Sequence, residues 1–337
     1  MRDNLLPTLE LVAQQLRAPR FDAEEFDKLK RERLAAIEQS KSEPQLLANV
    51  ALARRLNPKP KGHMMYVSTP DEQIADVGAV TLDQVKAFHR DYYGAAYGDL
   101  AVVGDFDSTA VSAAAARLFG DWKNPQPFSR AVRTYVAVDS TLESITTPDK
   151  ANAAFYAGQN LAVRDDDPDY PALVLANFMM GGGFLNSRIA TRLRQKEGIS
   201  YGVGTSLSAQ SLDRAGTFQT FAIYAPQNAE RLVRAFREEV DRVLKDGFTA
   251  EEVAAAKSGY LQGRSQGRAN DDELIGTLVS RRFAGRTMAY DAEFERRVAA
   301  LTPAQVNATV KKYIDPSKMV LVRAGDFAKF PPQRAVQ

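Results

Sequence analysis

Cysteine is absent from this chain of 337 residues, and histidine occurs only twice, at His63 and His89. The missing cysteine excludes disulfides, iron–sulfur clusters, thiolate zinc sites and a thiol nucleophile. A zinc site needs three or four ligands with fixed geometry, and neither histidine lies in a His-x-x-Glu-His sequence or its reverse. We therefore expect no metal ligands in this chain.

A large excess of one charge and a long apolar run are missing as well. Lys and Arg number 44 against 42 Asp and Glu, which gives a net charge of +2. Such a balance lacks the positive field that non-specific nucleic-acid binding requires, so no nucleic-acid partner is expected. No apolar stretch approaches the roughly 20 residues that cross a bilayer, so no membrane partner is expected either.

What is present is an ordinary globular composition, with 45% hydrophobic and 26% charged residues. At roughly 100–200 residues per domain, the length suggests two domains. The first residues, Met1–Asn4, have no apolar core of a signal peptide. Either the protein stays inside the cell or this chain begins downstream of its natural start, and the compartment is left open.

Two parts of the sequence resemble each other in the same order. Phe21–Glu25 returns as Phe248–Glu252, and Gly104–Phe106 returns as Gly325–Phe327. Such a repeat predicts an α+β fold built from two homologous α/β domains. The predicted organisation is a first domain over 1–120, a linker over 121–133 and a complete second domain over 134–330.

The first copy is the shorter one. Residues 134–227 of the second copy have no counterpart in it, because the chain starts at that point of the repeat. We expect the first domain to lack its leading strands and helices and to expose a sheet edge or an apolar face. Bare edges and apolar faces recruit partners, so self-association or packing against a neighbour is predicted.

Periodicity and capping residues place the secondary structure. Asp22, with Glu25 three positions later, is typical of a helix start, and Thr81 opens another helix. Alternating apolar and polar residues from Tyr201 to Ala209 predict a half-buried strand. Helices are predicted over 5–18, 22–39, 81–93, 108–119, 173–180, 186–197, 228–246, 249–268, 271–284, 290–299 and 303–313. Strands are predicted over 100–103, 141–147, 152–159, 201–209, 216–224 and 319–324.

Two glycine motifs carry candidate chemistry. Gly263–Gly267 reads Gly-x-Ser-x-Gly, but a nucleophile elbow needs a preceding strand, and no histidine follows position 89, so a helix interior is predicted. Gly181–Gly183 could bind phosphate at a helix start. No Lys-Ser/Thr pair follows it and no strand leads into it, so a turn that another backbone approaches closely is predicted.

Two adjoining segments carry a family resemblance: Gly181–Ile189, which reads GGGFLNSRI, and Leu193–Tyr201, which reads LRQKEGISY. They resemble the pitrilysin (insulin-degrading enzyme) family of zinc metallopeptidases, which includes the mitochondrial processing peptidase. The resemblance implies two halves, each of two similar α/β domains, that close around an unfolded peptide. The first half carries the inverted zinc motif and a later glutamate ligand.

This chain resembles the second half, which usually lacks zinc. Where the later glutamate ligand would fall, the chain has Gln39 beside Glu38, and the second copy has Gln266. The resemblance thus implies no cofactor in this chain and zinc on a partner half, on the same or another polypeptide. The chain is expected to be inactive by itself and to meet an unfolded peptide substrate when assembled.

Arg194 and Tyr201 match the arginine and tyrosine that the second half supplies to the substrate. The resemblance implies that they contact the substrate and its oxyanion in trans. Gly198, which lets the chain turn between them, can bring both donors to one end of the sheet. The residues alone also allow structural roles, with Arg194 complementing a helix C-terminus and Tyr201 an ordinary strand aromatic. The predicted substrate-binding residues are Gly181, Gly182 and Gly183.

Two functions follow from the resemblance. The first is the non-zinc half of a metallopeptidase, which adds substrate contacts to an active site on the zinc-binding half. The alternative is a non-enzymatic scaffold or peptide-binding protein of the same fold. Bacterial members of the family are often periplasmic, so the resemblance suggests that compartment while a cytoplasmic one stays open.

Overall fold

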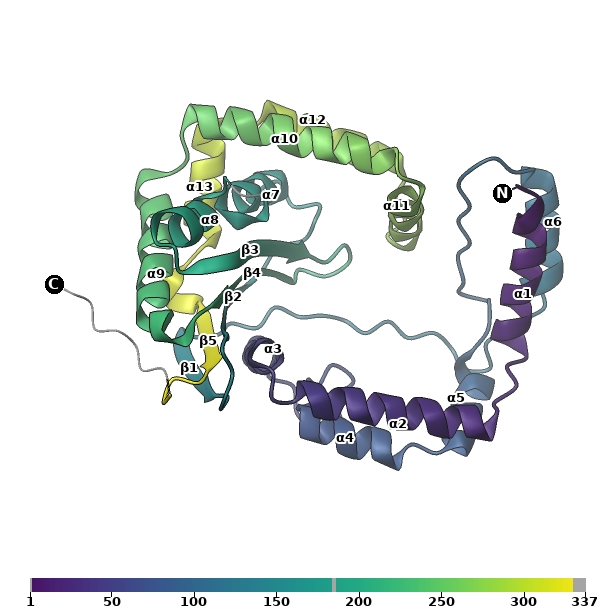
Figure 1. Cartoon of the computed structure of the whole chain (residues 1–337). Helices are drawn as coiled ribbons and strands as arrows, with labels where there is room; N and C mark the ends of the chain where they lie inside the picture. Colours follow the sequence, from purple (N-terminus) through teal and green to yellow (C-terminus); the bar gives the residue numbers. More distant parts are fainter. Residues whose placement is uncertain (1, 184–185, 330–337) are drawn as a thin grey trace. The chain divides into compact units, whose positions relative to one another are not determined.

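The computed structural model describes residues 2–183 and 186–329 (Figure 1). Contacts between Cα atoms divide them into two compact units that interleave along the sequence. Unit 1 takes its residues from 1–38, 71–131 and 266–289, and unit 2 takes its residues from 39–70, 132–265 and 290–337. The domain boundaries at 1–120, 121–133 and 134–330 stay a prediction about the repeat, because the compact units exchange segments between the two copies.

Unit 1 is helical in its described residues. Its helices are α1 (Leu5–Arg17), most of α2 (Ala23–Ser40), most of α4 (Pro70–Ala79), α5 (Leu82–Tyr92), α6 (Ser108–Phe119) and α11 (Asp271–Phe283). The Asp22 carboxylate accepts hydrogen bonds from the amides of Glu24 and Glu25, and Thr81 forms a capping box with Gln84. The predicted starts of α2 and α5 are confirmed.

The strand predicted over 100–103 is wrong, because these residues pair with no other backbone as a strand. A strand forms only where its amide and carbonyl groups find a neighbouring strand. The described residues of unit 1 contain no other strand. The repeat pairs 100–103 with β5 (Val320–Gly325), which forms because it lies between two strands of unit 2.

Unit 1 also leaves many apolar side chains in contact with solvent. Its buried hydrophobic residues are Leu9, Ala13, Ile37, Val111 and Ala114. Its exposed large hydrophobic residues are Leu6, Leu11, Val12, Leu16, Leu29, Val80, Phe88, Tyr92, Tyr93, Tyr97, Leu100, Phe128, Val279 and Phe283. The expectation of exposed apolar surface is confirmed for the described part of this unit, whereas self-association stays a prediction.

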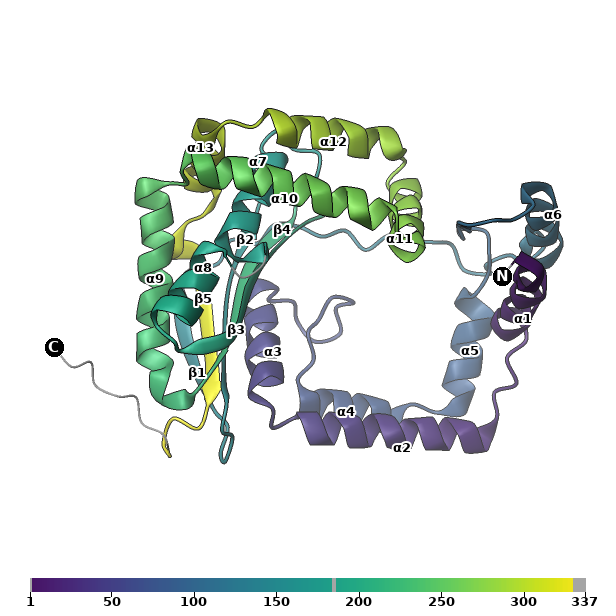
Figure 2. The same cartoon turned by 45° about the horizontal axis from the view of Figure 1, so that its top comes forward.

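Unit 2 contains a five-stranded sheet with the order β1-β5-β2-β4-β3 (Figure 2). The strands other than β5 are β1 (Thr141–Thr146), β2 (Ala153–Leu161), β3 (Ser200–Ala209) and β4 (Gly216–Tyr224). β1 runs parallel to β5, and the other neighbours are antiparallel. These strands match the predicted ones, and β3 lies at the edge of the sheet with β4 as its neighbour.

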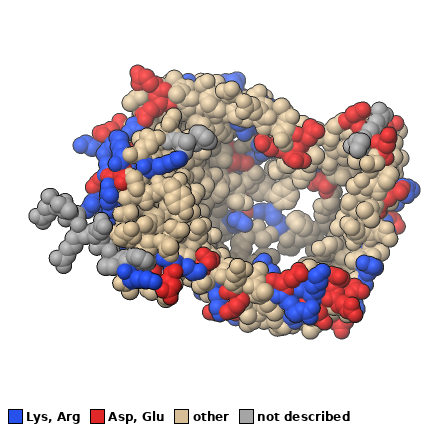
Figure 3. Space-filling model, in the orientation of Figure 1, with Lys and Arg blue, Asp and Glu red and all other residues tan. Residues whose placement is uncertain are grey.

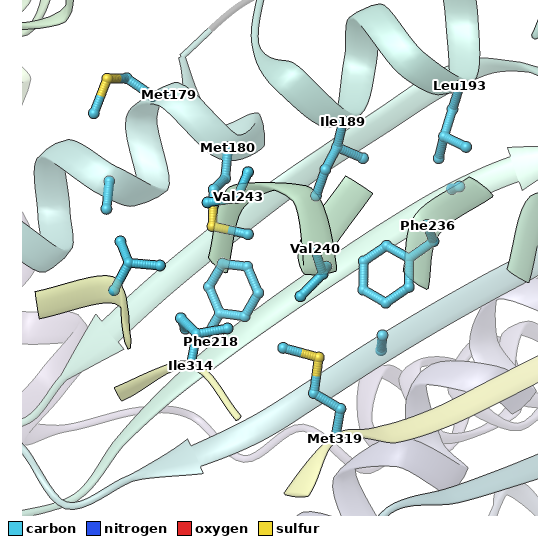
Figure 4. Close-up of a cluster of buried hydrophobic side chains, with 14 of the residues drawn as sticks. Met179, Met180, Ile189, Leu193, Phe218, Phe236, Val240, Val243, Ile314 and Met319 are labelled. Atoms are coloured by element: carbon cyan, nitrogen blue, oxygen red, sulfur yellow. The ribbon is translucent and has the colours of Figure 1, made fainter. Parts of the chain in front are cut away.

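Helices and apolar side chains cover one face of this sheet. The helices are α7 (Tyr170–Asn177), α9 (Ala229–Asp246), α10 (Ala250–Arg268), α12 (Met288–Ala300) and α13 (Pro303–Tyr313). Figure 4 shows Phe236 and Val240 of α9 in the core with Phe218 of β4. Gly247, with φ of 74°, follows α9 as predicted. In the part of the chain that the structure describes, no helix is both long and apolar enough to cross a bilayer.

A helix of the first copy, α3 (Pro44–Leu56), covers the other face at β1, β2 and β5. Its Leu52 and Leu56 are buried there, and a Cβ on Gly158 would lie 2.9 Å from Leu56 Cδ1. α3 is not among the helices predicted from the sequence. The repeat pairs Arg54–Arg55 of α3 with Arg281–Arg282 of α11, and α11 belongs to unit 1. The two copies therefore exchange this helix.

Candidate functional site

The glycine run lies against the edge strand. A π-helical turn, Phe178–Gly182, continues α7 and brings Gly181 onto β3. A Cβ on Gly181 would lie 2.6 Å from Thr205 Cγ2 and 2.9 Å from the Thr205 amide nitrogen. The close backbone approach predicted for this run is confirmed. Phe184 and Leu185, which follow in the motif, lie outside the described residues, and the substrate-binding role of Gly181, Gly182 and Gly183 stays a prediction.

Arg194 lies in an irregular helix rather than the regular one predicted over 186–197. A short helix, α8 (Arg188–Ala190), continues as the π-helical stretch Thr191–Lys196. Ile189 and Leu193 point into the core, where Figure 4 shows them, and both are fully buried. Arg194 is exposed and makes no hydrogen bond or ion pair with any described residue. It lies in the last turn of this stretch, so the alternative structural role at a helix C-terminus stays a prediction.

Gly198 reverses the chain between Arg194 and the strand. Its φ is 63°, a left-handed conformation that glycine adopts without steric cost. The amide of Ile199 donates to the Leu193 carbonyl at 3.0 Å, which closes the end of the helical stretch. The predicted turn at Gly198 is confirmed, and Tyr201 follows it directly on β3.

Tyr201 occupies a β-bulge at the start of β3. Ser200 pairs with Tyr224 and Gly202 pairs with Ile223, so Tyr201 is the extra residue of the bulge. The Ser200 hydroxyl donates to the Ile223 carbonyl at 2.8 Å and anchors this kink. Tyr201 is 67% exposed, so it is not an ordinary packed strand aromatic. Bulges of this kind re-aim a side chain and are common beside active sites.

A partly buried ion pair ties the segment after the glycine run to α10. Arg188 donates from two nitrogens to Glu252, at 2.5 and 2.8 Å, and also to the Gly247 carbonyl. Burial by itself would raise the pKa of Glu252, but hydrogen bonds from Arg188 and the Thr249 amide outweigh it and lower that pKa. This pair is not among the contacts predicted from the sequence, although Thr249 and Glu252 have the spacing of a capping box.

Basic side chains gather around this segment, over α8 and α9 in Figure 3. Arg192 pairs with Glu197 and Glu238, and Arg231 pairs with Glu197. Arg194, unlike Arg192 and Arg231, has no carboxylate partner among the described residues. An arginine that no protein carboxylate neutralises remains available to a substrate.

The residues considered for metal binding do not assemble a site. His63 lies in a loop, where its Nδ1 accepts from the Met65 amide, and His89 lies on α5 near the Leu16 carbonyl. Gln39 and Gln266 lie on the separate helices α2 and α10. The described residues contain no group of three His, Asp or Glu side chains placed to hold a metal ion, so zinc does not fit them. Gly263–Gly267 lies inside α10, as predicted.

Comparisons with known proteins agree on the family. Residues 79–260 match the sequence profile of a family described as the peptidase M16 inactive domain. A crystal structure of a peptidase M16 inactive domain from Pseudomonas fluorescens is 28% identical to the chain, with a TM-score of 0.81. The match covers 99% of this chain and 76% of that chain.

Curated relatives carry both peptidase and non-peptidase names. An uncharacterized zinc protease of Streptomyces coelicolor is 28% identical over 246 residues, which are 71% of this chain. This chain spans about half of that relative, 52% of its length. A non-peptidase homolog of Helicobacter pylori is 20% identical over 316 residues, 89% of this chain and 67% of the relative. Because the profile matches more than half of the sequence, the chain belongs to the peptidase M16 inactive-domain family, a branch of the metallopeptidase family that its motifs indicated.

Proposed function

We propose that this chain is the non-zinc half of a zinc metallopeptidase and supplies substrate contacts to an active site on a zinc-binding half. The observation that carries the proposal is the Tyr201 bulge, which presents an exposed phenol at the start of an edge strand. Arg194, exposed and unpartnered among the described residues, lies seven positions before it.

The edge strand supports binding of an extended peptide. β3 has β4 as its neighbour on one side, and an edge strand offers its free amide and carbonyl groups to another chain. Peptides add to such edges as a further strand, with affinity from main-chain hydrogen bonds. A peptide on β3 would pass Tyr201 at the start of the strand.

The chemistry of the two side chains suits a developing negative charge. Water adding to a peptide carbonyl leaves an oxyanion, and donors positioned for it stabilise the transition state more than the substrate. The Tyr201 hydroxyl donates one hydrogen bond, and the Arg194 guanidinium offers several donors with a positive charge. Both roles need the partner half, because the reacting carbonyl is held there.

The proposal is tested in the complex with the zinc-binding half. Tyr201→Phe removes only the hydroxyl and should lower turnover by roughly 10²–10³ while the complex still forms. Arg194→Ala should weaken both turnover and peptide binding. Peptide cleavage, peptide affinity and complex formation are measured for each variant.

Matched controls are Tyr97→Phe, which removes the hydroxyl of another exposed tyrosine, and Arg237→Ala on α9. Both controls should cleave peptide at the parental rate. The assignment is wrong if the Tyr201 and Arg194 variants assemble and also cleave at that rate.

The second candidate is a peptide-binding or scaffold protein without a peptidase role. It is favoured by the non-peptidase name of the Helicobacter pylori relative. Under this alternative the chain binds extended peptides along β3, but no zinc-binding partner cleaves them. Co-purification of the natural protein with a zinc-containing peptidase subunit decides between the two.

A further inference from the structure

Part of the sheet face that α3 packs against carries polar side chains and a pocket. The pocket has a volume of about 470 Å³, and its floor includes Asn160, Ser208, Gln210, Thr217 and Gln219. The register pairs Thr217 with both Asn160 and Ser208, so these side chains share one face of β2, β4 and β3. Hydroxyl and amide groups on a sheet floor can hydrogen-bond a peptide.

The walls of the pocket are held in place by specific contacts. The Asn160 side chain donates to the Leu56 carbonyl at 2.7 Å and to the Val136 carbonyl at 2.9 Å. It thereby ties the end of α3 and the extended segment 133–136 to the floor. The loop after α3 is fastened as well, because the Asn57 side chain donates to the Met65 carbonyl at 2.6 Å.

Arg54 of α3 also holds this loop in place. Its guanidinium donates to the Tyr66 hydroxyl at 2.9 Å and lies 5.1 Å from the centre of the Tyr66 ring. Met64, Met65 and Tyr66, from this loop, line the pocket. Met65 and Tyr66 are therefore held in place by the folded unit, whereas Met64 is exposed.

The charged residues that line the pocket are all basic. Lys59 and Arg133 are its charged lining residues, and no Asp or Glu lines it. Neither cationic side chain forms an ion pair with a described residue. The Asp213 carboxylate accepts from the backbone amide of Arg133 and does not line the pocket. Two free cations beside a polar floor favour a carboxylate ligand.

The pocket lies at the end of β3 opposite Tyr201. Seven residues separate Tyr201 from Ser208, which at ~3.3 Å per residue is about 23 Å along the strand. An extended peptide that passes Tyr201 reaches the pocket after about the same number of residues. One peptide of moderate length can therefore occupy both places.

We propose that this pocket is a second peptide subsite, which takes an acidic side chain of an extended peptide about seven residues from the position at Tyr201. The proposal rests on the proposed binding of peptides along β3 and adds a sequence preference to it. Lys59 and Arg133 bind the carboxylate, and the methionine and tyrosine side chains contact its apolar neighbours.

The test uses the full chain and acetylated, amidated peptides of about twelve residues that differ only near one end, where they carry Glu, Gln or Lys. Calorimetry at low salt should give the Glu peptide roughly two- to tenfold higher affinity than the Gln peptide, with the Lys peptide weakest. The preference should shrink at high salt because ions screen exposed charges. The double substitution Lys59→Gln with Arg133→Gln should abolish the preference for the Glu peptide over the Gln peptide.

The matched control is Arg237→Gln with Lys245→Gln, the same charge change on α9, which packs on the other face of the sheet. This control should keep the preference for Glu. Equal binding of the Glu and Gln peptides, or a preference that survives the Lys59 and Arg133 substitutions, overturns the subsite while leaving peptide binding intact. A Gln peptide with a free carboxyl end that outcompetes the Glu peptide overturns it in favour of a terminal carboxylate. Failure of every peptide to bind overturns the subsite and peptide binding along β3 by this chain alone, whereas the Tyr201 and Arg194 contacts are tested separately in the complex with the zinc-binding half.

Discussion

At the scale of single residues, Gly181 shows how the glycine motif works. Its hydrogen atoms face Thr205, and any Cβ there would meet the backbone of β3 as well as the threonine side chain. A backbone cannot move aside as a flexible side chain can, so the π-helical turn must shift. The glycine is required by packing, whatever the substrate contacts of the turn are.

Gly181→Ala should destabilise the chain by about 1–3 kcal/mol, because overpacking displaces the turn from the strand. The matched control is Gly263→Ala inside α10, where a Cβ would meet nothing within 4 Å. That change should stabilise the chain by up to about 1 kcal/mol, since alanine is the better helix former. Urea denaturation measures both, and equal stability of the two variants would contradict the packing role.

At the scale of elements, the Arg188–Glu252 pair joins the start of α8 to the start of α10. Arg188 follows the glycine run, and Glu252 also accepts from the Thr249 amide that precedes α10. One carboxylate therefore caps a helix and anchors the segment that leads to Arg194. Removing the Arg188 guanidinium leaves the partly buried Glu252 carboxylate with the hydrogen bond from the Thr249 amide.

Arg188→Gln should cost about 1–2 kcal/mol at neutral pH, as expected for a hydrogen bond to a charged group. Because the pKa of Glu252 is lowered in the folded chain, its contribution is full above its unfolded pKa of about 4.3 and is lost as the pH falls through the folded value. The stability difference between parent and variant should therefore shrink in acid. Denaturation at neutral and acidic pH measures it.

The control for this prediction is the exposed ion pair between Arg296 and Glu293, which Arg296→Gln removes. Exposed pairs contribute little, so this variant should match the parent at both pH values. A stability difference for Arg188→Gln that stays constant with pH would show that Glu252 is not the group concerned.

At the scale of the whole molecule, unit 1 exposes a face that its repeat partner buries. Extending the repeat to the start of the chain aligns α1 with α9, so Leu6 corresponds to Val233 and Leu16 to Val243. Val233 and Val243 are 5% and 2% exposed in the core of unit 2, whereas Leu6 and Leu16 are 36% and 40% exposed. Part of the core-facing stripe of α9 thus recurs on α1 as exposed leucines, whereas Leu9 and Ala13, the counterparts of Phe236 and Val240, are buried.

We expect this chain to self-associate through that face. Leu6→Gln with Leu16→Gln should weaken association roughly tenfold, because each leucine loses apolar burial at the interface. Leu212→Gln, at an exposed leucine of unit 2, should leave association unchanged. Sedimentation over a range of concentrations measures this, and a monomer at every concentration contradicts the prediction.

Local sequence determined where several helices, strands and turns of this protein form. The helix starts at Asp22 and Thr81, the alternation that forms β3 and the turn at Gly198 each depend on residues close in the chain, and each appears where it was predicted. The repeat and the motif around the glycine run likewise identified the fold and the family, because both are patterns of sequence.

Tertiary structure decided the rest. The strand expected over 100–103 does not form because its pairing depends on backbone groups far away in the sequence. α3 joins unit 2 because its Leu52 and Leu56 are buried against the distant sheet. The bulge at Tyr201 exists only in register with β4. The two pocket walls that Asn160 joins come from segments far from it in the sequence, so no local pattern could reveal them.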